Sequence, residues 1–204
     1  MVIMIFLILS NFFSSISSFD EQSCLILKMK SDPILRGKES IELVFGVKNC
    51  SKHNLILYNF AEAIEADQFE EGFYCNPNIT AGITLFIYDA NSKMKWPDIK
   101  FSDSIAFHPK QEEWFVKSVN EARNKFHENM VLAEVGHEME LRRTIDLKPF
   151  HLKKGTYNLL LVYFAGENIS NLVSIAQMEA DQRKNNAKIY QGCARSNKVT
   201  LVIE

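Results

Sequence analysis

The chain has 204 residues, of which 47% are hydrophobic and 24% are charged, so it can bury the core of one globular domain. Its formal net charge of -2 supplies no positive field, and we therefore expect neither nucleic acid nor an anionic membrane surface as a partner. The 15 Phe and 6 Tyr favour strands, because aromatic rings pack well on a pleated surface.

The N-terminal 18 residues are uncharged, and residues 1–9 form an unbroken apolar run. Such a run before small polar residues is typical of a signal peptide, and it is shorter than the roughly 20 apolar residues that cross a bilayer. We expect residues 1–18 to be a signal peptide and residues 19–204 to be the mature domain, with no transmembrane segment after signal removal. A buried N-terminal strand is the alternative. Export predicts a secreted, periplasmic or cell-surface location and an environment that oxidises cysteines.

Several segments alternate apolar and polar residues with a period of two, which predicts half-buried strands. In residues 39–49, the apolar side chains at positions 41, 43, 45 and 47 face away from Glu42 and Lys48. Residues 157–164 are apolar on both faces, as expected of a central strand covered on both sides. The predicted strands cover residues 25–29, 39–49, 55–58, 84–88, 113–116, 138–147, 156–164 and 198–203. They predict a single antiparallel sandwich of two sheets with seven to nine strands.

Two segments carry a helical pattern instead. Ser118 and Glu121 fit a capping box, after which apolar residues follow at helical spacing as far as Met130, and Gly136 is the expected end. The second segment covers residues 171–184, with Leu172, Ile175, Ala176 and Glu179 on one face. Both segments lie in connections between strands. The fold class predicted is therefore mainly β, with one or two short helices inserted in connections.

Three segments resemble parts of a known architecture. Residues 152–159 (LKKGTYNL) resemble the L-x-x-G-x-Y-x-L entry to a late strand of immunoglobulin-like sandwiches. Residues 192–199 (GCARSNKV) resemble the G-x-x-x-S-N-x-V last strand of exported bacterial sandwich modules, and residues 33–49 resemble their opening strands. The resemblance implies an exported, bacterial-type immunoglobulin-like β-sandwich module but no particular chemistry. The connection over residues 166–191 is longer than is usual in such modules.

Four cysteines, Cys24, Cys50, Cys75 and Cys193, allow three disulfide pairings. Their spacing lacks the close pairs of a zinc site. In an immunoglobulin-like sandwich the first strand can run parallel to the last, which implies the bond Cys24–Cys193 and leaves Cys50–Cys75 to staple the connection after the third strand. A free Cys24 and a Cys50–Cys193 bond are the alternatives.

Asn49, Asn78 and Asn168 each begin an Asn-x-Ser/Thr triplet, so they are possible glycosylation acceptors if the source is eukaryotic. Motifs for a serine nucleophile, a phosphate loop or a dinucleotide are missing from the sequence, and we expect no catalytic residue, cofactor or bound metal. His127-Glu128 and His137-Glu138 each pair a histidine with an acid, without the second histidine of a zinc-protease helix.

We therefore expect an exported, non-enzymatic module that binds another protein or a surface polymer. Binding is expected on the long connections, at about residues 60–82, 117–136 and 166–192, because loops on a rigid scaffold usually carry it. A proteinase inhibitor that presents an exposed loop is one alternative. A hydrolase is another, and a pocket joining His127 or His137 to the acidic residues at 62–71 would indicate it.

Overall fold

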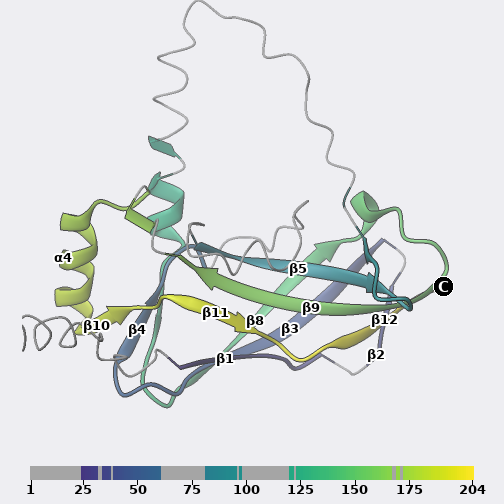
Figure 1. Ribbon diagram of the computed structural model, residues 1–204, viewed down its shortest axis with the longest axis horizontal. Coiled ribbons are helices and arrows are strands. Elements are labelled where there is room, and N and C mark those ends of the chain that lie inside the picture. The colour runs from purple at the N-terminus through teal and green to yellow at the C-terminus, as the bar shows by residue number, and fades with distance from the viewer. Residues whose placement is uncertain are drawn as a thin grey trace, which may run out of the picture.

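The computed structural model of the protein describes residues 24–31, 34–37, 39–60, 81–95, 97, 120–121, 123–166, 169–170 and 172–204. This part of the chain is mainly β, with helices in the connections, as expected (Figure 1). The strands are β1 (Leu25–Met29), β2 (Ile34–Gly37), β3 (Ser40–Asn49), β4 (Asn54–Leu57), β5 (Ala81–Asp89), β6 (Met94–Lys95), β7 (Val131–Ala133), β8 (Glu138–Asp146), β9 (Gly155–Ala165), β10 (Ala187–Ile189), β11 (Gly192–Arg195) and β12 (Val199–Ile203). The helices are the 3-10 turn η1 (Lys148–Phe150), α4 (Ile175–Asn185) and a helical stretch at residues 120–121 and 123–128.

Two larger sheets form the sandwich. One is antiparallel with the order β1-β3-β8, and the other has the order β2-β12-β9-β5-β6, with β11 also paired to β9. Side chains from both sheets belong to one buried cluster, which includes Leu43 and Phe45 of β3, Leu85 of β5 and Leu161 of β9. The core therefore lies between the two sheets.

The predicted strand patterns are confirmed where the structure describes them. The apolar side chains at positions 41, 43, 45 and 47 of β3 are buried, whereas Glu42 and Lys48 are exposed. On β9, Leu159 and Leu161 face the main core, while Leu160 and Val162 belong to a second buried cluster with Phe86. The central position of β9 between β5 and β12 explains why its sequence is apolar on both faces.

The disulfide pairing expected from the sequence is wrong. The structure bonds Cys24 to Cys50, with their Cα atoms 5.0 Å apart, in place of Cys24–Cys193 and Cys50–Cys75. The reason is that β1 pairs antiparallel with β3, which sets Leu25 opposite Asn49 and brings the start of one strand to the end of the other. Cys193 is also disulfide-bonded, and Cys75 lies outside the described residues.

The expected parallel pairing of a first strand with the last one exists, but β2 makes it and β1 does not. β2 pairs in parallel with β12, with Ile34 opposite Thr200. The chain thus crosses from one sheet to the other between β1 and β2. The sequence prediction treated the start of the chain as a single strand and so attached Cys24 to the wrong sheet.

Other differences concern short elements. The strands β2, β6, β7, β10 and β11 were not predicted, and none of them exceeds four residues. The stretch at 123–128 gives way to β7 at Val131, so Gly136 does not end the helix but turns the chain before β8, with a φ of 73°. The predicted strand at 113–116, the signal peptide at 1–18 and the Ser118 cap lie outside the described residues. Within the part of the chain that the structure describes, no helix has the length and apolar character needed to cross a membrane.

Candidate functional site

A third, small sheet brings the two inserted helices together. Its order is β10-β4-β7, with β4 in the middle. β7 directly follows the helical stretch at 123–128, and β10 directly follows α4. Because both strands pair with β4, both helices are held near Tyr58, the residue that follows β4. Figure 1 shows α4 beside β10 and β4 at one end of the molecule.

Individual residues explain where α4 begins and ends and how the helical stretch at 123–128 is anchored. Ser174 caps α4, since its side chain accepts a hydrogen bond from the backbone N–H of Gln177 at 3.2 Å. Asn186 ends α4 in the left-handed conformation. The stretch at 123–128 is fixed by Phe126, which is buried and stacks on the ring of Tyr58 with 6.0 Å between centroids.

Asp181 of α4 lies at the centre of the polar contacts between these elements. It is 4% exposed and is the one buried residue of α4. The Tyr58 hydroxyl donates to its Oδ2 at 2.7 Å, and Nε2 of His127 lies 3.0 Å from the same oxygen. The side-chain amide of Gln177 donates to Oδ1 at 2.9 Å. One carboxylate therefore contacts the residue that follows β4, the stretch at 123–128 and its own helix.

These contacts determine the protonation state of the cluster. Burial acts to raise the pKa of Asp181, but hydrogen bonds from Tyr58, Gln177 and His127 outweigh it and hold that pKa below its ordinary value. Burial and the neighbouring carboxylate raise the pKa of Tyr58, which keeps its hydroxyl as a donor. An ionised carboxylate only accepts hydrogen bonds, so we assign a hydrogen to Nε2 of His127.

A groove opens beside this cluster. It has a volume of about 450 Å³ and receives Arg123, Asn124, His127 and Glu128 from one connection. The other connection contributes Ser170, Leu172, Val173, Ser174 and Gln177. His127 and Gln177 thus line the groove and contact Asp181 at the same time, with 38% of the His127 side chain exposed.

A second cavity, of about 440 Å³, lies at the opposite end of α4. It is lined by His53, by Glu179, Gln182 and Arg183 of α4, and by Asn186, Ala187 and Lys188. Glu179 and Arg183 are exposed and form an ion pair at 3.6 Å. None of the residues that line this cavity contacts the buried Asp181 through its side chain in the described part of the chain, whereas His127 and Gln177 of the groove do.

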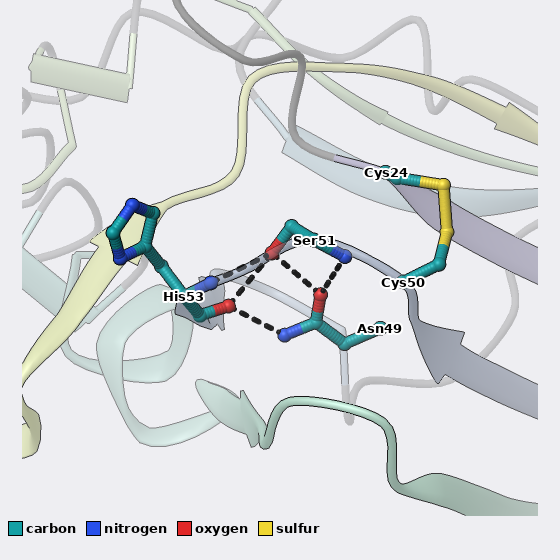
Figure 2. Close-up of a disulfide and its surroundings, with 5 residues drawn as sticks. All are labelled: Cys24, Asn49, Cys50, Ser51 and His53. Carbon is teal, nitrogen blue, oxygen red and sulfur yellow. Dashed lines mark hydrogen bonds between the residues drawn. A yellow bond between two sulfur atoms is a disulfide. The ribbon is translucent and has the colours of Figure 1, made fainter.

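Asn49 does not present a glycosylation acceptor in the folded chain. Its side chain is fully buried, and Nδ2 donates to the backbone oxygens of His53 at 2.7 Å and Ala133 at 2.8 Å. Its Oδ1 accepts from the backbone N–H and the hydroxyl of Ser51 (Figure 2). Asn49 is a structural residue beside the Cys24–Cys50 disulfide, and Asn78 and Asn168 lie outside the described residues.

The two candidate histidines are placed differently. His127 lines the groove, whereas His137 is exposed and pairs through Nδ1 with Glu134 at 2.8 Å. The acidic residues at 62–71 lie outside the described residues. Sequence reasoning missed Asp181, because α4 was assigned the wrong buried face. Ile175 on the predicted face is 64% exposed, and no local pattern signals partners 123 and 54 residues away.

Within the described part of the chain, no group of three His, Cys, Asp or Glu side chains could hold a metal ion. A comparison with protein-family models finds none that matches this chain, and no curated protein matches it.

Proposed function

We propose that the protein is an exported, non-enzymatic binding module whose groove beside His127 holds a segment of another protein. The observation that carries this proposal is the convergence of two connections on one groove. Side chains from the described parts of two connections in which binding was expected line it together, four between positions 123 and 128 and five between positions 170 and 177. The sandwich and the β10-β4-β7 sheet provide the rigid support that a binding site on connections needs.

The proposed module is immunoglobulin-like in architecture. The strand order supports this assignment, since β1-β3-β8 form one sheet, β12-β9-β5 lie side by side in the other, and β2 runs parallel to the last strand. This architecture serves many functions, so the proposal of binding rests on the groove and not on the fold.

The lining of the groove suits a polypeptide segment. Arg123 and Glu128 supply both signs of charge, and the amides of Asn124 and Gln177 can donate and accept hydrogen bonds. Leu172 adds apolar surface, together with the buried Val173. A polypeptide presents backbone donors and acceptors, charged groups and apolar side chains within a few residues. A short segment of a few residues also has a volume that fits a groove of this size.

Site-specific crosslinking tests the proposal on the whole exported chain. A photoreactive amino acid replaces Asn124 in the groove, and in a matched variant it replaces the exposed Arg142 of β8. We expect adducts only from position 124, with fragment spectra that identify one partner peptide. Adducts that form equally at position 142, or that a glycosidase removes and a protease does not, would contradict binding of a protein segment in the groove.

One observation favours a hydrolase as the second candidate. His127 lines the groove and is held by a buried carboxylate, which is how a general base is commonly oriented, and Ser170 and Ser174 line the same groove. Turnover of chromogenic esters or peptides that disappears in His127→Ala would favour hydrolysis over binding. The Cys24–Cys50 disulfide does not support the inhibitor alternative, because it joins two strand ends and rigidifies no loop.

A further inference from the structure

The way α4 docks is unusual for a surface helix. Surface helices commonly bury an apolar stripe, but the one buried residue of α4 is the acidic Asp181, and Ile175 is 64% exposed. Asn185 adds a hydrogen bond from its side-chain amide to the backbone oxygen of Asp181 at 2.9 Å. Met178 of α4 is partly buried and packs against the main core, but the one fully buried side chain of the helix is this carboxylate. The position of α4 against the sheet therefore rests on polar contacts of Asp181 together with the packing of Met178.

The two oxygens of that carboxylate reach both walls of the groove. Oδ2 contacts His127 on one wall and Tyr58 on the sheet, and Oδ1 accepts from Gln177 on the other wall. Nε2 of His127 also lies 3.3 Å from the amide nitrogen of Gln177. With a hydrogen on each nitrogen, this contact joins two donors and is no hydrogen bond, so both groups are oriented by Asp181 and not by each other.

We propose that Asp181 is a positioning residue of the groove: its carboxylate holds the hydrogen of His127 on Nε2, so that the groove offers Nδ1 as an acceptor to a hydrogen-bond donor on the bound segment. In a neutral imidazole one nitrogen carries the hydrogen and the other accepts, and the partner of the first fixes the role of the second. The bound segment would then present a backbone N–H, a hydroxyl or an amino group at His127. The expectation that the ligand is a protein segment rests on the proposed function. The expectation that His127 carries its hydrogen on Nε2 does not.

Proton–nitrogen correlation spectra of the isotope-labelled imidazole rings, recorded without ligand at about pH 8, test the tautomer. A free neutral imidazole already favours Nε2–H moderately, so we expect more of His127: in the wild-type chain it should be almost wholly Nε2–H. In Asp181→Asn the introduced amide can donate to Nε2, so the Nδ1–H tautomer should gain population relative to the wild type. The matched control is Glu179→Gln, which removes the same charge from an exposed position of α4 and should leave the His127 spectrum unchanged.

Hydrogen exchange provides a second measurement on the same variants. Because Asp181 docks α4, we expect amides of residues 175–185 to exchange about tenfold faster or more in Asp181→Asn, while those of β5 and β9 keep their wild-type rates. Tyr58→Phe keeps the carboxylate and should keep the Nε2–H tautomer even where stability falls.

A wild-type His127 that carries its hydrogen on Nδ1, or whose nitrogen shifts match those of the exposed His53, would overturn the inference. So would an equal response to Glu179→Gln and Asp181→Asn. The wild-type spectrum decides the matter even where Asp181→Asn does not fold. Neither measurement uses a ligand, so a failed crosslinking test with the expected spectra would remove the proposed function and leave the role of Asp181 intact.

Discussion

Asp181 is stable as a buried carboxylate because donors surround it. A charge removed from water costs several kcal/mol unless hydrogen bonds replace its hydration, and here Tyr58, His127 and Gln177 supply them. The same arrangement makes each donor important, since the loss of one leaves part of a buried charge unpaired. Stability and site geometry therefore depend on the same few side chains.

Removal of the Tyr58 hydroxyl should be costly. Tyr58→Phe deletes a hydrogen bond to an ionised, buried acceptor, so we expect the free energy of unfolding to fall by about 1.5–3 kcal/mol in denaturant titrations. The matched control is Tyr157→Phe, whose hydroxyl donates to the neutral backbone oxygen of Lys153 at 2.8 Å. The control should lose about 1 kcal/mol. Equal losses in the two variants would show that the charge of Asp181 does not strengthen the bond.

The lowered pKa of Asp181 predicts a dependence of stability on acid. A carboxyl group whose pKa is lower in the folded than in the unfolded chain stabilises the fold above its unfolded value of about 4. That contribution is lost as the pH falls through the lower, folded value. Asp181→Asn has no such group, so its free energy of unfolding should fall less steeply than that of the wild type below about pH 4. Denaturant titrations over a pH series measure the two slopes, and parallel slopes would contradict the prediction.

At the scale of elements, the Cys24–Cys50 bond shows how strand pairing determines disulfide pairing. β1 and β3 run antiparallel, and the backbone N–H of Cys50 donates to the backbone oxygen of Cys24 at 2.9 Å. The strands thus bring the two cysteines together even without the sulfur–sulfur bond. The bond then closes a loop with a sequence separation of 26 residues, which restricts the unfolded chain.

Replacement of both Cys24 and Cys50 by Ser should lower the free energy of unfolding by about 3.5 kcal/mol, from the entropy of a loop of that length. The sandwich should still form, because the pairing of β1 with β3 does not require the bond. Peptide mapping of the wild-type chain without reduction should find Cys24 linked to Cys50, and Cys193 linked to Cys75, the one cysteine that remains. A loss below about 1 kcal/mol, or a Cys24–Cys193 peptide, would contradict this account.

At the scale of the whole molecule, the sequence predicts local patterns better than the order of strands. The alternation in β3 and the two apolar faces of β9 identify core strands, because burial acts on each side chain directly. The change of sheet between β1 and β2 leaves no such mark, and it misled the disulfide assignment. The groove is a similar case. The length of the two connections that line the groove was enough to predict them as binding segments. The role of Asp181, in contrast, depends on contacts with Tyr58 and His127 that exist only because of the order of the strands.

The Cys24–Cys50 bond also determines how the folded chain would transmit force. A pull on residue 24 reaches β3 through two sulfur atoms before it loads the hydrogen bonds between β1 and β3. β1 therefore cannot be unzipped from its first residue. The tension passes instead into the end of β3, which is bonded to β1 on one side and to β8 on the other, so two ladders of hydrogen bonds oppose it instead of one. If the chain is pulled from its N-terminal side, the disulfide-bonded form should withstand a higher force than the reduced form. In the reduced form, β1 can be peeled away from β3 first.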